Sequence, residues 1–290
     1  WVRTPAGVLH CRVRGRLKRG RKARTDLAVI GDLVRVRPLP EEPGEGVIEE
    51  VRARANRFAR RQPGGRGRYK EDVLVANLDR IFVVLAGASP SPNPRLLDRF
   101  LVIAELDRID AAVVVNKIDR AGRAAAERLF APYAALGYPV FYTSARTGEG
   151  VDALRRELAG GVSAFVGPSG VGKSSLLNAL EPGLGLAVGA VSEALEKGRH
   201  TTRVAELHPL AGDGWVADTP GIRELASFAL PRDALDACFP EMRPHLGRCR
   251  FARCTHLHEP ACAVREAVAR GAIAEDRFES YRRIFAGQER

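Results

Sequence analysis

The segment from residue 167 to 174 constrains the fold more than any other part of the chain. It reads Gly-Pro-Ser-Gly-Val-Gly-Lys-Ser, follows the apolar run 164–166 and precedes the helix-like stretch 175–180. A strand, a glycine-rich turn and a helix in this order predict a phosphate-binding loop, because successive backbone N–H groups and the helix N-terminus face the anion. The segment therefore favours an α/β fold that binds a nucleotide.

We expect the loop and the residue after it to contact the nucleotide: Gly167, Pro168, Ser169, Gly170, Val171, Gly172, Lys173, Ser174 and Ser175. Within it, Lys173 is predicted to reach the β- and γ-phosphates and so to take part in catalysis. The hydroxyl of Ser174 is predicted to ligate Mg²⁺ bound with the nucleotide.

Continuous apolar runs on both sides of this loop predict a mainly parallel sheet, because strands covered on both faces are apolar throughout. The runs are 81–86, 111–115, 140–142, 163–166 and 215–217, and stretches with helical spacing lie at 94–106, 121–136 and 151–158. Residues 80–225 are therefore predicted to form one α/β domain.

Four residues after the run 111–115 predict which base is bound. They read Asn116-Lys117-Ile118-Asp119 and lie where α/β sheets bind ligands, at a strand's carboxyl end. The Asp119 carboxylate can accept from both the ring N–H and the amino group of guanine, whereas adenine presents an acceptor there. The Lys117 stem can cover the base, and Asn116 can tie neighbouring loops together. GTP and GDP are therefore expected rather than ATP.

A second base-reading segment is predicted after the run 140–142. The small residues Ser144 and Ala145 would let a backbone N–H approach guanine O6 there. Two further segments carry the pattern of nucleotide switches. Asp218 ends the run 215–217 and is expected to hold Mg²⁺ through water, while the N–H of Gly221 meets the γ-phosphate.

The other switch is predicted at Gly-Arg-His-Thr-Thr, residues 198–202, where Thr202 rather than Thr201 completes the Mg²⁺ shell. Two interpretations of His200 stay open: it contributes to hydrolysis once a partner orders the segment, or it faces solvent or RNA. Ile222 stands where many GTPases have a Gln that orients water, so intrinsic hydrolysis is expected to be slow.

Three of the five cysteines lie close together near the C-terminus. Cys249, Cys254 and Cys262 fall within 14 residues, together with His256. Three thiolates and one imidazole suffice for a closed tetrahedral zinc site, which predicts one structural Zn²⁺ per chain. His258 is a competing imidazole on spacing alone.

The positive charge is concentrated in residues 1–70, which hold 19 Lys+Arg and 7 Asp+Glu, whereas the formal net charge of the whole chain is +11. The stretches 9–14 and 32–37 alternate apolar residues with arginines, which indicates strands of a small β-barrel. Residues 60–70 are polar and glycine-rich and are expected to be a linker or a mobile basic loop. Such basicity on a strand-rich unit favours contact with RNA phosphates.

The motifs stand in an unusual order, because both guanine-reading segments precede the phosphate loop. This order predicts a circular permutation, which surface termini permit. The chain resembles the circularly permuted, small-subunit-dependent GTPases of bacteria, the RsgA family. The resemblance rests on these motifs in sequence: a basic β-barrel, Asn-Lys-Ile-Asp at 116–119, Gly-Val-Gly-Lys-Ser-Ser at 170–175, Gly-Arg-His-Thr-Thr at 198–202, Asp-Thr-Pro-Gly-Ile at 218–222 and the Cys/His cluster.

The resemblance implies an OB-fold RNA-binding domain with a linker over residues 1–70, a permuted GTPase domain over 71–228 and a zinc-binding, partly helical domain over 229–290. It favours His256 over His258 as the zinc ligand. It also implies GTP hydrolysis that is stimulated by the ribosome, a late role in maturation of the small subunit, and nucleotide-dependent binding to 16S rRNA.

Two other functions remain as alternatives. One is an ATP-using enzyme with the same phosphate loop, and the other is an RNA-binding module that uses GTP only as a conformational ligand. No apolar run approaches the roughly 20 residues that span a bilayer. We therefore expect a cytoplasmic monomer without a membrane partner.

Overall fold

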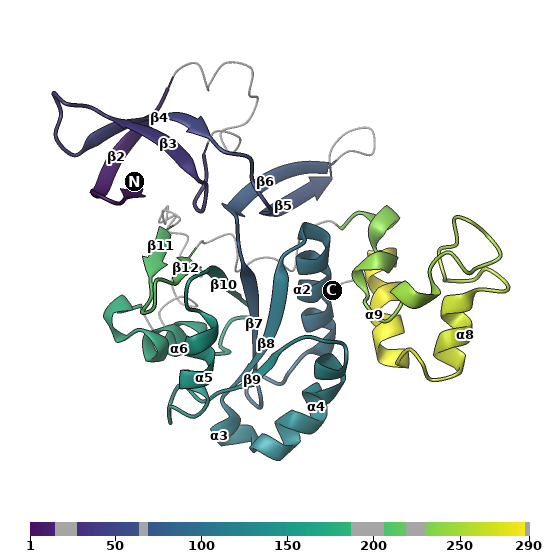
Figure 1. Cartoon of the computed structure of the whole chain (residues 1–290). Helices are drawn as coiled ribbons and strands as arrows, with labels where there is room; N and C mark the ends of the chain where they lie inside the picture. The colour runs from purple at the N-terminus through teal and green to yellow at the C-terminus, as the bar shows by residue number, and fades with distance from the viewer. Residues whose placement is uncertain (15–27, 64–68, 187–205, 219–229, 288–290) are drawn as a thin grey trace, which may run out of the picture.

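The computed structural model describes residues 1–14, 28–63, 69–186, 206–218 and 230–287. N-terminal strands, a central α/β unit and C-terminal helices follow one another along the chain (Figure 1). Within the described residues, no helix is both long enough and apolar enough to cross a membrane.

The N-terminal strands form a half-barrel sheet with the strand order β1-β2-β4-β3, which confirms the predicted all-β unit. Its members are β1 (Val2–Thr4), β2 (Gly7–Val13), β3 (Val34–Pro38) and β4 (Glu45–Val51). Strand β4 pairs parallel to β2 and antiparallel to β3. The turn between β3 and β4 contains Gly44, whose φ of 85° favours glycine.

A two-stranded hairpin takes the place of most of the linker expected at residues 60–70. Strand β5 (Arg57–Pro63) pairs antiparallel with β6 (Tyr69–Ala76) as far as Pro63 and Tyr69. The polar composition did not predict these strands, because backbone hydrogen bonds can pair two strands whose side chains are polar. The base of the hairpin is apolar, and Phe58 and Val75 are buried in the core of the central unit.

The central sheet has the strand order β11-β12-β10-β7-β8-β9. Its members are β7 (Arg80–Ala86), β8 (Asp110–Asn116), β9 (Val140–Tyr142), β10 (Val162–Val166), β11 (Glu206–Pro209) and β12 (Trp215–Asp218). All neighbours pair in parallel except β11, which runs antiparallel to β12 at the edge. The prediction of a mainly parallel sheet is confirmed.

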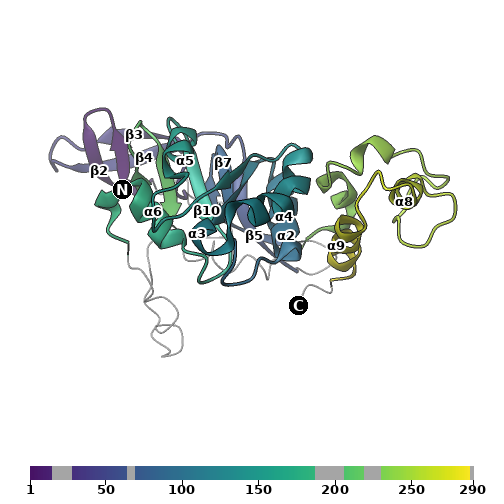
Figure 2. The same cartoon turned by 90° about the horizontal axis from the view of Figure 1, so that it is seen from below.

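Helices cover both faces of this sheet (Figures 1 and 2). They are α2 (Pro94–Asp107), α3 (Ile118–Ala121), α4 (Arg123–Ala135), α5 (Val151–Glu157) and α6 (Lys173–Leu180), followed by the 3-10 turn η3 (Pro182–Leu184). The helix expected over 121–136 is preceded by the short α3, and the two are separated at Gly122, whose φ is 80°.

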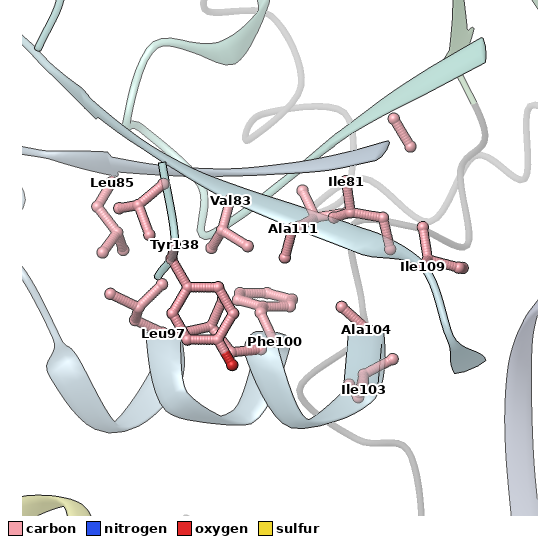
Figure 3. Close-up of a cluster of buried hydrophobic side chains, with 14 of the residues drawn as sticks. Ile81, Val83, Leu85, Leu97, Phe100, Ile103, Ala104, Ile109, Ala111 and Tyr138 are labelled. Carbon is pink, nitrogen blue, oxygen red and sulfur yellow. The ribbon is translucent and has the colours of Figure 1, made fainter. Parts of the chain in front are cut away.

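Alternate side chains of β7 divide the core into two layers. Ile81, Val83 and Leu85 face α2 and α4, whereas Phe82 and Val84 face α5 and α6. Figure 3 shows the first layer, with Leu97 and Phe100 of α2 pointing at the sheet. Burial on both faces explains why the strands read as continuous apolar runs.

The C-terminal unit has a hydrophobic cluster of its own, which the sequence did not reveal. It is built from 3-10 turns and two helices: η5 (Arg232–Ala234), η6 (Asp236–Cys238), η7 (Arg243–His245), α8 (Ala263–Ala269) and α9 (Glu275–Ala286). Phe239, Met242 and Tyr281 are at most 1% exposed within it, and Val102 of α2 joins the same cluster.

A buried ionic cluster fastens this unit to α2. The Arg277 guanidinium on α9 lies 2.5 Å from Asp98 of α2 and 2.6 Å from Glu241. The hydroxyl of Tyr133 on α4 donates to the same Asp98 carboxylate at 2.8 Å. Because Asp98 and Arg277 are at most 5% exposed, each charge depends on the other for compensation.

We expect Arg277→Met to lower the free energy of unfolding by about 3–5 kcal/mol, because Asp98 and Glu241 would stay buried without their cation. Urea unfolding followed by circular dichroism measures the loss. The matched control is Arg282→Met on the same helix, where an exposed pair with Glu279 should contribute less than about 1 kcal/mol. Equal losses in the two variants would contradict the assignment.

Candidate nucleotide and metal sites

The nucleotide motifs gather at one edge of the central sheet, although they are far apart in the sequence. Asn116 ends β8, Thr143 follows β9, Gly167 follows β10, and Asp218 is the last residue of β12. These strands are parallel, so their carboxyl ends share an edge. The order of the motifs along the chain therefore does not separate them in space.

The phosphate loop needs glycine at two positions for different reasons. Gly167 has a φ of 139°, and a Cβ there would lie 2.2 Å from the backbone oxygen of Val84. Gly172 has a φ of 92°, and its Cβ would lie 2.6 Å from the Nδ2 atom of Asn116. The first glycine lets the loop pass over β7, and the second lets the start of α6 approach the base-reading strand.

Lys173 lies across the phosphate loop as the first residue of α6. Its ammonium group donates to the backbone oxygens of Gly167 at 2.8 Å and Pro168 at 2.7 Å. Ser174 follows it in the first turn of the helix, half-buried. The lysine therefore lies over the loop whose N–H groups would receive phosphate oxygens.

Asn116 connects three loops through one buried side chain that is 1% exposed. Its Nδ2 donates to the backbone oxygen of Val171 in the phosphate loop at 3.0 Å. Its Oδ1 accepts from the backbone N–H of Ala145 at 3.2 Å and from the hydroxyl of Thr143 at 3.4 Å. The phosphate loop and both guanine-reading segments are thus held at fixed distances from one another.

Lys117 makes a second connection on the exposed side. Its backbone is left-handed, with a φ of 62°. Its Nζ donates to the backbone oxygens of Ser89, in the loop that follows β7, at 2.7 Å and of Gly170 at 2.5 Å. The aliphatic stem is thereby stretched along the phosphate loop.

Asp119 is held by two neighbours from the second guanine-reading segment. Its Oδ1 accepts from the hydroxyl of Ser144 at 2.6 Å, and its Oδ2 accepts from Arg146 Nε at 2.9 Å. The hydrogen bond from Ser144, followed by that from Arg146, holds the pKa of Asp119 below its usual value, so the carboxylate is ionised at neutral pH. Arg146 was not identified from the sequence, because an arginine after Ser-Ala carries no signal of its own.

A cavity of about 230 Å³ opens between these segments. It is lined by Asn116, Lys117, Asp119, Arg120, Ala145, Arg146, Gly172 and Ser175. The residues predicted to read the base therefore share one cavity with the end of the predicted phosphate loop. Three of the predicted site residues, His200, Thr202 and Gly221, lie outside the described residues, and for Asp218 only the backbone is described.

Four side chains of the C-terminal unit form a candidate metal site. The ligand atoms of Cys249, Cys254, His256 and Cys262 all lie within 4.8 Å of one another. The sulfurs of Cys249 and Cys262 are 3.8 Å apart, and His256 Nδ1 is 3.3 Å from the Cys262 sulfur. A tetrahedral zinc ion with Zn–S bonds of ~2.3 Å separates its thiolates by about 3.8 Å, so the donor set fits zinc.

Hydrogen bonds around the cluster fix the ligand loop. The Glu259 carboxylate accepts from the backbone N–H of Thr255 at 2.7 Å and of Leu257 at 3.1 Å, on both sides of His256. The other ring nitrogen of His256, Nε2, lies 3.4 Å from Asp236 Oδ2, the kind of contact that orients a metal-binding imidazole. Glu259 and Asp236 were not predicted, because supporting carboxylates have no fixed spacing from the ligands.

Comparison with known proteins agrees with the nucleotide motifs. The family model described as RsgA GTPase matches residues 51–228. A protein of Gemmatimonas aurantiaca named small ribosomal subunit biogenesis GTPase RsgA is 51% identical over 269 residues, which are 93% of this chain and 87% of that relative. The protein of the same name from Moorella thermoacetica is 44% identical over 281 residues, 97% of this chain and 90% of the relative.

Solved structures show the same architecture. The crystal structure of YjeQ from Thermotoga maritima matches with a TM-score of 0.75 and 34% identity, over 96% of this chain and 88% of that one. YloQ, described as a circularly permuted GTPase, matches with a TM-score of 0.72 and 29% identity, over 96% and 85% of the two chains. With its motifs, its permuted order and these matches, the chain belongs to the RsgA family of GTPases.

Proposed function

We propose that this protein binds the small ribosomal subunit through 16S rRNA and acts late in its maturation, hydrolysing GTP to GDP and phosphate. Turnover is stimulated by the subunit, and nucleotide state controls rRNA binding. The observation that carries the proposal is the cavity in which the Asp119 carboxylate, the Ala145 backbone and the end of the phosphate loop come together. The names of the curated relatives support the choice of subunit.

The described side chains support a model for binding and orientation of the nucleotide. The Asp119 carboxylate would accept from the ring N–H and amino group of guanine, with the hydroxyl of Ser144 holding it in place. Lys173 would exchange its two backbone oxygens for the β- and γ-phosphate oxygens. Mg²⁺, held by Ser174, Thr202 and Asp218, would neutralise phosphate charge when bound.

Hydrolysis itself requires an oriented water molecule. Ile222 follows Gly221 and cannot orient water, so the missing group would come from His200 or from the partner when the subunit is bound. The small subunit would then be both the binding partner and the activator. The protein would hydrolyse GTP slowly until it binds the subunit.

Replacing Asp119 tests which base is read. In Asp119→Asn, an amide presents one acceptor and one donor to the two donors of guanine, so GDP affinity should fall about 5- to 150-fold. Xanthosine diphosphate, which carries an oxygen in place of the amino group, should gain affinity. Competition against fluorescent GDP measures both changes.

Asp110→Asn, at the exposed start of β8, is the matched control and should leave both affinities unchanged. Measuring the affinity for ATP in the same assay distinguishes a GTPase from the alternative of an ATP-using enzyme. An Asp119→Asn protein that kept wild-type GDP affinity, or a wild-type protein that preferred ATP, would refute the guanine assignment.

Hydrolysis measured with and without purified small subunits tests the function itself. Subunits should raise the turnover number by at least about tenfold, the effect of ~1.4 kcal/mol of transition-state stabilisation. Lys173→Ala should remove the stimulated turnover, because the γ-phosphate would lose its fixed cation. Subunits that raised nucleotide affinity without raising turnover would instead support an RNA-binding module for which GTP is only a conformational ligand.

We also propose one structural Zn²⁺ in the Cys/His cluster, because its four donors and their spacing match tetrahedral zinc. His256→Ala should lower the zinc content well below one ion per chain and reduce the melting temperature of the C-terminal unit. The matched control is His258→Ala, since His258 is exposed and lies outside the cluster. Zinc loss in the His258 variant alone, measured by atomic absorption, would reverse the assignment.

The rRNA contact of the N-terminal unit is proposed for residues 15–27 and 60–70 rather than for its four-stranded sheet. Three arginines, one directly after β2 and two in β3, are paired with glutamates: Arg14 lies 3.7 Å from Glu49, Arg35 lies 3.2 Å from Glu50, and Arg37 lies 3.1 Å from Glu49. The surplus charge belongs to residues 15–27, with six Lys+Arg and one Asp, and to residues 60–70, with five Lys+Arg and no acid. Such runs are suited to phosphate contacts.

The remaining expectations stay proposals. We propose a cytoplasmic monomer divided into an OB-type unit over residues 1–70, a permuted GTPase unit over 71–228 and a zinc-binding unit over 229–290. Strand β6 crosses the first of these boundaries, so the hairpin β5–β6 connects the first two units.

A further inference from the structure

The segment around Cys249, up to the next cysteine of the candidate zinc site, presents an aromatic ring and three cations to solvent. We call Arg248, Arg250, Phe251 and Arg253 the zinc-loop patch. Phe251 is 46% exposed, although large apolar side chains are usually covered. The three arginines are exposed as well, and the guanidinium carbon of Arg250 lies 5.8 Å from the centre of the Phe251 ring.

These arginines differ from those of the N-terminal sheet in their partners. Among the described residues, no acidic side chain pairs with Arg248, Arg250 or Arg253, whereas Arg35 and Arg37 are paired with glutamates. An unpaired cation does not have to break an existing ion pair before it binds an anion. The zinc-loop patch therefore offers positive charge that is available to a partner.

The patch is held in a fixed shape from both ends. Cys249 and Cys254, two members of the candidate zinc site, enclose the residues 250–253. The backbone N–H of Arg250 also donates to the backbone oxygen of Ala261 at 3.1 Å. A preorganised surface loses little conformational entropy on binding, which favours affinity from a small contact area.

We propose that the zinc-loop patch binds an unpaired RNA nucleotide, with the base stacked on Phe251 and the flanking phosphates contacted by Arg248 and Arg253. An exposed ring beside cations matches the two parts of a single-stranded nucleotide, a flat base and a charged backbone. An acidic peptide would use the arginines but would have no need of the ring. The inference rests on the proposed binding to rRNA for its physiological ligand.

A tryptophan at the ring position reports stacking directly. In the full-length, zinc-loaded Phe251→Trp protein, titration with an adenosine oligoribonucleotide of about 8 nucleotides should quench fluorescence beyond the change seen with Trp1 and Trp215 alone. Phe251→Ala should weaken binding about 5- to 150-fold, the usual effect of losing one stacked base. Arg248→Gln and Arg253→Gln should each reduce the slope of log K against log salt by about 0.7.

Leu129→Ala on α4 is the matched control, because this side chain is 43% exposed and lies outside the zinc-loop patch. It should bind the oligonucleotide as the unmodified protein does, and zinc content and GDP affinity are measured for every variant to show that the fold is kept. Absence of additional quenching, or unchanged RNA affinity in Phe251→Ala, would overturn the proposal. Equal quenching by a polyglutamate peptide would also overturn it and would indicate a protein partner.

The result is separable from the proposed function. If subunits stimulate hydrolysis by the unmodified protein while Phe251→Ala binds RNA normally, the zinc-loop patch is refuted and the GTPase function stands. If subunits fail to stimulate hydrolysis while Phe251→Trp is quenched by RNA, the patch stands and the proposed function fails.

Discussion

The buried amide of Asn116 is the contact on which the geometry of the proposed nucleotide site depends. It hydrogen-bonds Val171 in the phosphate loop and Ala145 in the second guanine-reading segment, from the end of a third strand. A buried amide without partners costs about 1–3 kcal/mol, so these hydrogen bonds favour the arrangement in which the three loops lie together. This contact is made in space and not along the chain, which is why the motifs can be permuted in sequence without losing the site.

The central sheet and its loops were predictable because their signals are local. Continuous apolar runs identified β7 and β8, and short motifs at strand ends identified Asn116 and Gly167 as neighbours. The hairpin β5–β6 was not predictable, since its paired residues include several arginines and Pro63, and two glycines follow in the sequence, which is a composition typical of a linker. Strand pairing there depends on the backbone, which composition does not describe.

The attachment of the C-terminal unit to α2 was not predictable from the sequence either. Arg277 and Asp98 are 179 positions apart, and neither lies in a motif, so only the folded chain shows that they form a pair. At the N-terminus, charge counts predicted more unpaired positive charge on the sheet than the structure shows. They located the basic segment correctly, but they could not show that glutamates of β4 pair with the arginines of its sheet.

Helix α2 is packed on both sides, against β7 and β8 on one and against α9 on the other (Figures 1 and 2). Its first turn is capped by Asn93, at the end of the loop whose Ser89 oxygen receives Lys117. Because α2 packs against the sheet and against α9, a tilt of this helix would change both contacts. The helix therefore contacts both the sheet that carries the predicted nucleotide motifs and the C-terminal unit, so a change in the packing of either one alters a surface that the other also uses.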